Sequence, residues 1–209
     1  FAMKFVIAPD SFKGCMTAKQ ACAAIRDGLL RVFPDAEYVM VPMADGGEGT
    51  VRSLVDATHG RICSAQVLDP LQRETFAEYG ILGNANDSGL TAIIEMSAAS
   101  GIQFVDEHTR NPLVATTYGT GQLMKHALDD GVRTIILGVG GSATNDGGAG
   151  MAEALGVRFL DEHGNPIPRG GGFLDRLATV DVSGLDPRIA NTRILIASDV
   201  TNPVSYTHL

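Results

Sequence analysis

Basic side chains and cysteines are scarce in this sequence of 209 residues. Lys and Arg number 16 against 24 Asp and Glu, and the resulting net charge of -8 repels nucleic acid and anionic membrane surfaces. The three cysteines, Cys15, Cys22 and Cys63, form no CxxC pair and leave one thiol over, as is typical of a reducing compartment. We therefore expect a cytoplasmic protein without a nucleic-acid or membrane partner.

Long apolar runs and several common catalytic motifs are also missing. The first apolar run, residues 5–8, is too short for a signal peptide or a membrane span. No GxxxxGK[ST], HExxH or GxSxG sequence occurs, which argues against ordinary P-loop NTPases, zincins and serine hydrolases of the elbow type. With 44% hydrophobic residues, the chain is still able to bury a sizeable core in one large or two small domains.

The apolar pattern predicts an α/β fold made of two α/β domains. Residues 4–8 and 38–41 are expected strands, each followed by a helix, and Thr17 with Gln20 forms a capping box before the first helix. This order is typical of a parallel sheet. Short strands then dominate residues 61–96, which marks a change of architecture.

The change of pattern near Gln66 gives the expected domain boundary. Residues 3–66 are assigned to the first α/β domain, whose sheet is incomplete, and residues 67–203 to a second, mixed α/β domain. The second domain is expected to contain a helix that Gly131 ends, a strand before the glycine-rich loop, and two later strands. Residues 204–209 show no periodicity and are expected to be a non-native tail.

Two glycine-rich turns each carry an acid. "DGGEG" (45–49) and "DGGAG" (146–150) both stand between an expected strand and an expected helix. Glycine after a strand lets the backbone approach a ligand, and the N–H groups at the following helix start face anions. An aspartate within about 4 Å of a phosphate charge would cost on the order of 4 kcal/mol at an effective dielectric of 20, so a positive group must intervene.

Three roles are open for these two aspartates. Asp45 and Asp146 are suited to bind Mg²⁺, which is commonly held by one or two carboxylates together with substrate phosphates. Alternatively, Asp146 is a general base that removes the proton of an acceptor hydroxyl. In the third interpretation both side chains only cap helices.

Further polar residues stand where open parallel sheets bind ligands. In "APDSFKG", Asp10, Ser11 and Lys13 follow the first strand, and Lys13 offers a positive charge to a phosphoryl oxygen. "TTYGTG" places hydroxyl groups, that of Thr117 among them, at a helix start. Arg110 is suited to pair with a substrate carboxylate in the two-pronged geometry that arginine favours.

A dinucleotide site is the competing interpretation. "GVGGSA" (138–143) satisfies G-x-G-x-x-A after a strand, and Asp161 lies about 20 residues further on, where a ribose-binding acid belongs. This pattern predicts an oxidoreductase with a nicotinamide cofactor. Against it, Asp146 would lie close to the pyrophosphate without a metal, and the first strand has no such fingerprint.

Five segments together resemble the bacterial glycerate kinases (glycerate 2-kinase, type I family). The segments are, in order, "APDSFKG", "PMADGGEGT", "RNPL…TTYGTG", "ILGVGGSATNDGGAGM" and "ASDVTNP", and the resemblance extends from Met3 to about Pro203. It implies ATP- and Mg²⁺-dependent phosphorylation of D-glycerate to 2-phosphoglycerate by a phosphotransferase with an alcohol acceptor. It also implies a cleft between two α/β domains, the first of them with a flavodoxin-like or Rossmann-like parallel sheet. Family members continue well beyond Pro203, so the chain is expected to be truncated, and a non-catalytic fragment is the third hypothesis.

The resemblance also implies roles for individual residues. Lys13, Asp146 and Asp199 are expected to be catalytic, and Asp45 and Glu48 to bind the metal. The remaining expected site residues are Asp10, Ser11, Arg110, Thr117, Asn145 and Asn202 for the substrate, and Gly46, Gly47, Gly140, Gly141 and Ser142 for phosphate or nucleotide. The sequence leaves open which acid is the base, whether position 2 or 3 of glycerate is phosphorylated, and whether the protein is a homodimer.

Overall fold

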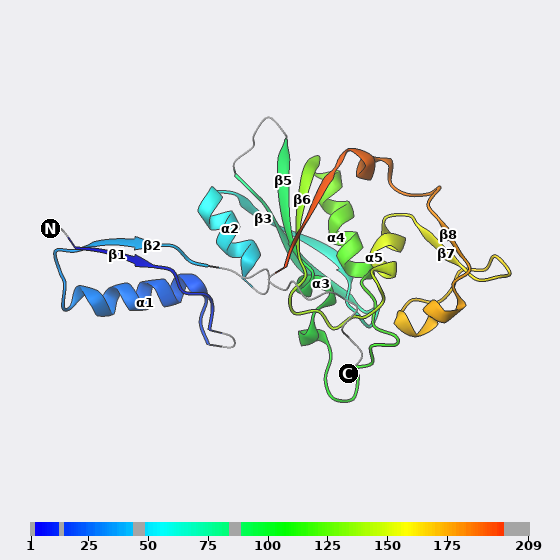
Figure 1. The fold of residues 1–209 in the computed structure, drawn as a ribbon, viewed down its shortest axis with the longest axis horizontal. Helices are drawn as coiled ribbons and strands as arrows, with labels where there is room; N and C mark the ends of the chain where they lie inside the picture. Colours follow the sequence, from blue (N-terminus) through cyan, green and yellow to red (C-terminus); the bar gives the residue numbers. More distant parts are fainter. Residues whose placement is uncertain (1–2, 13–14, 44–48, 84–88, 199–209) are drawn as a thin grey trace.

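The computed structural model describes residues 3–12, 15–43, 49–83 and 89–198. Within these ranges the strands form three sheets: the parallel pair β1 (Lys4–Ile7) and β2 (Glu37–Met40); the five-stranded sheet of β3 (Arg61–Leu68), β4 (Glu74–Ile81), β5 (Leu90–Glu95), β6 (Val132–Gly138) and β9 (Arg193–Ala197); and the antiparallel pair β7 (Arg158–Leu160) and β8 (Thr179–Asp181). Figure 1 shows the five-stranded sheet in the middle, with β1-β2 on one side and β7-β8 on the other. The predicted α/β fold class is confirmed.

The N-terminal unit consists of β1, α1 (Ala18–Leu30) and β2. Its helix begins with the predicted capping box. The Gln20 N–H donates to the Thr17 hydroxyl, and the Gln20 side-chain oxygen accepts from the Thr17 N–H at 2.9 Å. The buried thiol of Cys22 donates to the Ile7 carbonyl oxygen at 3.5 Å. The helix therefore packs on the parallel pair in the strand–helix–strand order that the sequence predicts.

Two kinds of strand pairing meet at β5. Strand β4 runs antiparallel to its neighbours β3 and β5, whereas β5, β6 and β9 run parallel. The connection from β5 to β6 contains α3 (Ser97–Ser100), η1 (Ile102–Phe104) and α4 (Tyr118–Asp129), which provides the long crossover that parallel strands need. The carboxyl ends of β5, β6 and β9 therefore meet at one edge of the sheet.

Helices cover both faces of the five-stranded sheet. Ile94 of β5 is fully buried on the face that packs with Leu123 of α4. Its neighbour Ile93 points to the opposite face, as alternation along a strand requires, and packs with Val55 of α2 (Thr50–Thr58). Burial on both faces explains why the strand sequences read as continuous apolar runs.

The elements after β6 are short. They are α5 (Ala149–Ala154), η2 (Gly171–Arg176) and η3 (Pro187–Asn191), with β7 and β8 between them. Gly131, which follows α4, has a φ of 83°, as expected for the predicted C-terminal glycine of that helix. Among the described residues, no helix has the length and apolar character that a membrane crossing requires.

The division into domains of residues 3–66 and 67–203 stays a prediction. Residue 66 lies inside β3, and α2 packs on the five-stranded sheet. The N-terminal unit and α2 are joined by an ion pair of 2.9 Å between Lys19 and Asp56. The expected tail, 204–209, lies outside the described residues.

Two parts of the fold expose apolar side chains. Val6 and Val32 of the N-terminal unit are 63% and 68% exposed, and Ile196 of the edge strand β9 is 59% exposed. A two-stranded sheet is at best marginally stable by itself, because it buries little apolar surface. These surfaces are therefore suited to pack against further elements.

Replacement of Gly121 by alanine is expected to destabilise the fold, because α4 and α5 approach closely at this glycine. A Cβ atom at position 121 would lie 2.3 Å from the Met151 carbonyl oxygen and 2.7 Å from the Ala154 Cβ. We expect Gly121→Ala to lower the free energy of unfolding by about 1–3 kcal/mol in urea denaturation. The matched control is Gly28→Ala in α1, where a Cβ meets nothing within 4 Å and helix propensity should raise stability by up to ~1 kcal/mol. Equal effects of the two substitutions would contradict this packing.

Candidate active site

The carboxyl ends of the parallel strands define the edge at which the candidate site lies. Glu95 at the end of β5 is in register with Gly138 of β6, and Gly138 is in register with Ala197 of β9. Open parallel sheets bind ligands at such an edge, in the loops that follow the strands. The loop after β6, residues 139–148, is the predicted glycine-rich loop.

Backbone hydrogen bonds hold this loop on the segment that contains α3 and η1. The Ile102 N–H donates to the Gly141 carbonyl oxygen, and the Ala143 N–H donates to that of Ser100, both at 2.9 Å. Gly141 has a φ of 72°, which favours glycine, and a Cβ there would lie 3.2 Å from the Ser97 Cβ. Contacts within the protein therefore hold the loop against the segment that contains α3 and η1.

A cavity of about 440 Å³ lies beside the loop. Residues 142–145 of the loop line one wall, which we call the loop wall. Arg110, Asn111 and Pro112 line another wall, which we call the arginine wall, and Ile102 and Val105 complete the lining. The structure therefore brings together three of the predicted binding residues, Arg110, Ser142 and Asn145.

Arg110 brings a positive charge to the cavity. Its backbone N–H donates to the Asp106 carbonyl oxygen at 2.9 Å. No carboxylate of the described residues lies within ion-pair distance of its guanidinium. An arginine without an acidic partner, in a cavity that Asn145 and Ser142 also line, is suited to bind a small carboxylate or phosphate.

Asp146 directly follows the loop wall, and its side chain is only 1% exposed. Its carboxylate accepts from the Thr117 N–H at 2.8 Å and from the hydroxyls of Thr117 and Thr116 at 3.0 and 3.3 Å. It also accepts from the N–H groups of Gly148 and Gly150 at 3.0 and 3.2 Å. Five donors fill the lone-pair positions of a carboxylate. These contacts favour a structural role for Asp146 over metal binding or proton abstraction.

Both helices that follow glycine turns have an early N–H group bound by a buried carboxylate. At α5 the carboxylate is that of Asp146. At α2 it is that of Glu95, which is 8% exposed and accepts from the Val51 N–H at 2.7 Å. Helix N-termini attract anions because their N–H groups are unpaired and the helix dipole is positive there. At both helices a protein carboxylate already occupies that favourable position.

Sequence reasoning missed Glu95, although a signal for it was present. The residue ends the apolar run "LTAIIE", so its carboxylate follows an expected buried strand at the ligand-binding edge. Thr116 was also missed as an individual residue, since nothing in "TTYGTG" distinguishes the two threonines.

Asp10, Ser11, Gly140, Gly141 and Thr117, the other predicted site residues that the structure describes, do not line the cavity. Asp10 and Ser11 follow β1, where the Asp10 carboxylate accepts from the Ser11 N–H. Within the described ranges, neither of them forms a hydrogen bond with residues 139–148. Gly140 lies in the loop, and Thr117 contacts Asp146 instead of lining the cavity. Seven predicted residues lie outside the described ones: Lys13, Asp45, Gly46, Gly47, Glu48, Asp199 and Asn202.

The glycines of "RGGG" pack against both walls of the cavity. The Gly172 N–H donates to the Leu113 carbonyl oxygen at 2.9 Å, next to the arginine wall. A Cβ at Gly171 would lie 2.1 Å from the carbonyl oxygen of Asn145, in the loop wall. Sequence analysis assigns this segment no role, but successive glycines are a signal that the backbone approaches other backbone closely.

Arg169 anchors the same segment to two helices. Its guanidinium donates to both carboxylate oxygens of Glu153 in α5, at 2.9 and 3.0 Å. Its central carbon lies 3.5 Å from the centre of the Tyr118 ring at the start of α4. Bidentate pairing combined with stacking restrains an arginine strongly, so the segment has a defined position over the cavity walls.

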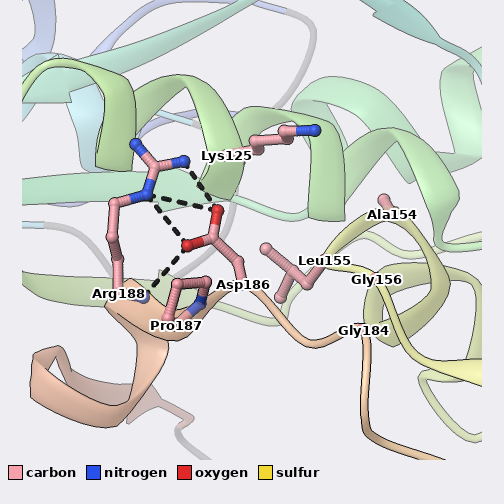
Figure 2. A pocket seen from close by; sticks show the side chains of 8 residues that line it. All are labelled: Lys125, Ala154, Leu155, Gly156, Gly184, Asp186, Pro187 and Arg188. Carbon is pink, nitrogen blue, oxygen red and sulfur yellow. Dashed lines mark hydrogen bonds and ion pairs between the residues drawn. The ribbon is translucent and has the colours of Figure 1, made fainter.

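A second cavity, of about 370 Å³, has a different charge balance. Figure 2 shows the guanidinium of Arg188 beside the Asp186 carboxylate. The arginine donates to Asp186 at 2.6 Å and to Asp129 at 2.7 Å. Lys125 is the other basic residue of the lining, which also contains Asp186 but not Asp129. Because Arg188 pairs with both carboxylates, it is less available to an anion than Arg110 is.

Metal and dinucleotide sites find no support in the described part of the chain. It contains no group of three or more His, Cys, Asp or Glu side chains placed to hold a metal ion. Asp161, the ribose-binding acid of the competing interpretation, accepts from the N–H groups of Asn165 and His163 at 2.8 and 2.9 Å. The bond from Asn165 is the main cause that lowers the pKa of Asp161. This carboxylate closes a turn after β7, so a local role explains its position.

The structure is that of an α/β protein with a cavity, lined by Arg110, beside the carboxyl ends of parallel strands. Residues 5–205 match the Glycerate kinase family. The chain belongs to this family, and the resemblance that five sequence segments indicate is confirmed.

Similar curated proteins and a similar solved structure support this assignment. Glycerate kinase from Haemophilus influenzae is 54% identical over 202 residues, which cover 97% of this chain and 52% of that protein. Glycerate 2-kinase from Escherichia coli is 52% identical over the same coverage. A crystal structure from Salmonella typhimurium LT2, assigned as glycerate kinase 2, has a TM-score of 0.84 at 52% identity, covering 97% of this chain and 54% of that one. The chain spans about half the length of the curated relatives it matches.

Substitution of Asp186 is expected to weaken the fold in a pH-dependent way. Hydrogen bonds from Arg188 lower the pKa of Asp186 to about 2. Because this folded-state pKa lies below the unfolded value of about 3.9, the carboxylate stabilises the fold above pH 4 and loses its contribution as the pH falls toward 2. We expect Asp186→Asn to lower the free energy of unfolding by ~1 kcal/mol at pH 7, since Arg188 is partly exposed.

Urea denaturation from pH 7 to pH 2 measures this effect. The difference between Asp186→Asn and the unsubstituted chain should shrink between pH 4 and pH 2. Asp35→Asn, at an exposed carboxylate, serves as the control and should change stability little at any pH. A difference for Asp186→Asn that is constant over this range would contradict the pairing.

Proposed function

We propose that this chain is part of an enzyme that transfers the terminal phosphoryl group of ATP to D-glycerate and forms 2-phosphoglycerate. The family of the chain and the names of its relatives support this reaction. The single observation that carries it is the cavity in which Arg110, Ser142 and Asn145 come together at the ligand-binding edge of the sheet. Because the chain has about half the length of these relatives, the proposal concerns a protein of full family length.

Arg110 binds the substrate carboxylate in this proposal. The residue has no acidic partner in the described structure, and pairing with a carboxylate would satisfy two of its N–H donors at once. Ser142 and Asn145 face the same space and are able to hydrogen-bond the hydroxyl groups of a three-carbon hydroxy acid. The cavity is larger than such an acid requires, which leaves room for a phosphoryl group next to it.

The reaction requires mainly positioning and neutralisation of charge. The glycerate hydroxyl oxygen attacks the terminal phosphorus, the bond from phosphorus to the bridging oxygen of ADP breaks, and the hydroxyl proton passes to a base. Lys13 for the phosphoryl oxygens and Asp199 for the proton stay predictions from the sequence. Gly46, Gly47 and Gly140 stay the predicted backbone contacts of the nucleotide phosphates.

Asp45 and Glu48 are the proposed ligands of Mg²⁺, which when bound neutralises phosphate charge. The buried carboxylate of Asp146 fits this role less well, because N–H and hydroxyl donors already occupy its oxygens. One oxygen of Glu95 likewise accepts from the Val51 N–H. We also propose a cytoplasmic location, on the basis of the composition. The homodimer stays a prediction.

A coupled assay tests the proposed reaction. Residues 3–203 would be joined to the C-terminal half of the Haemophilus influenzae relative, and that relative itself is the positive control. ADP formation should require D-glycerate, ATP and Mg²⁺ together, and phosphorus NMR should place the product phosphate on position 2. A folded chimera that forms no ADP in response to glycerate, beside an active control, would refute the proposal.

Arg110 is expected to control the affinity for the acid substrate. In the chimera, Arg110→Met should raise the KM for D-glycerate at least ~10-fold with a smaller change in kcat, because the lost ion pair is present both before and during phosphoryl transfer. Arg110→Lys should be intermediate, since a lysine keeps the charge without the fork. Arg133→Met, at an exposed residue of β6, is the control and should leave KM within ~2-fold. An unchanged KM in Arg110→Met would exclude this carboxylate contact.

A further inference from the structure

Asp146, Thr116 and Thr117 form a buried group of hydrogen bonds, which we call the threonine–aspartate node. All three residues are at most 2% exposed. The Thr117 hydroxyl donates to Asp146 at 3.0 Å and accepts from the Met151 N–H of α5 at 2.9 Å. The Thr116 hydroxyl donates to Asp146 at 3.3 Å and accepts from the Tyr118 N–H of α4 at 3.3 Å. Each hydroxyl therefore links the carboxylate to the start of a helix.

The charge of Asp146 is balanced by neutral donors. No basic side chain of the described residues lies within ion-pair distance of this carboxylate. The N–H groups of Thr117, Gly148 and Gly150 and the positive end of the helix dipole of α5 stabilise it instead. Loss of one donor leaves part of a buried charge unsatisfied, which is costly in an interior of low dielectric.

The node connects the two walls of the cavity. Asn145, in the loop wall, immediately precedes Asp146. From the arginine wall, Asn111 leads to Thr116 through a short turn in which the Ala115 N–H donates to the Asn111 carbonyl oxygen at 3.1 Å. Since both walls join the node through short stretches of chain, a displacement within the node is expected to change the distance between them.

We infer that Asp146 is a positioning residue that acts with Thr117 to fix the separation of Arg110 and Asn145. It neither accepts the substrate proton nor binds the metal, because either step would require its oxygens to leave five donors within a buried site. The substrate named in the kinetic test rests on the proposed function, whereas the coupling of Asp146 to Thr117 does not.

Thermal unfolding of the 209-residue chain tests the coupling without any activity. We expect Asp146→Asn and Thr117→Val each to lower Tm by roughly 5–10 °C. Thr117→Ser keeps the hydroxyl and should restore most of the loss. The double variant should lose clearly less than the sum of the two single losses, because both remove the same contacts. Additive losses, or an unchanged Tm in Asp146→Asn, would overturn the inference.

Thr116→Val is a milder variant for the case in which Asp146→Asn does not fold. It removes the longer of the hydroxyl contacts, at 3.3 Å, and should lower Tm by less than Thr117→Val does. A Thr116→Val chain as stable as the unsubstituted one, together with a stable Thr117→Val chain, would overturn the inference.

Steady-state kinetics of the chimera distinguish a positioning residue from a base or metal ligand. We expect Thr117→Val to reproduce the changes of Asp146→Asn in both KM for D-glycerate and kcat, with KM raised about 10-fold. Loss of turnover in Asp146→Asn combined with normal kinetics in Thr117→Val would show a direct chemical role and would refute the inference. A chimera that lacks all turnover contradicts the proposed function, while the Tm data still decide the coupling.

Discussion

The buried charge of Asp146 is the constraint on which the candidate site depends. A carboxylate that is 1% exposed persists only when donors saturate it, and here the donors come from two segments about 30 residues apart in sequence. The charge therefore selects one relative position of the α4 and α5 starts. The two cavity walls continue from these helix starts. The distance between the walls therefore depends on the hydrogen bonds that the Asp146 carboxylate accepts.

The same physics acts at the starts of α2 and α5, the two helices that follow the glycine-rich segments. An N–H group at a helix start attracts any anion, and the protein supplies its own: Glu95 at α2 and Asp146 at α5. A phosphate approaching those helix starts would meet a carboxylate. Positive charge is available instead at Arg110, and this favours the cavity between the two walls as the place where an acid substrate binds.

The sequence predicts the elements better than the directions of side chains. Strand runs, the capping box of Thr17 and the glycine that ends α4 follow from local periodicity and local conformational preference, so they are found in the structure. The gathering of Arg110 and Asn145 follows from the rule that loops after parallel strands share an edge. The burial of Asp146 depends on Thr117, a tertiary contact that no spacing in "NDGGAG" encodes.

The exposed apolar residues are consistent with the greater length of the relatives in this family. Parallel strands are normally buried on both faces, yet Val6 of β1 and Ile196 of β9 are more than half exposed. A unit of two strands and one helix cannot bury enough surface to account for such residues. The curated relatives are about twice as long, and an additional set of strands and helices would supply the missing cover. Asp10 follows β1, so such cover would also lie next to a predicted site residue, and the proposed activity therefore concerns the protein of full family length.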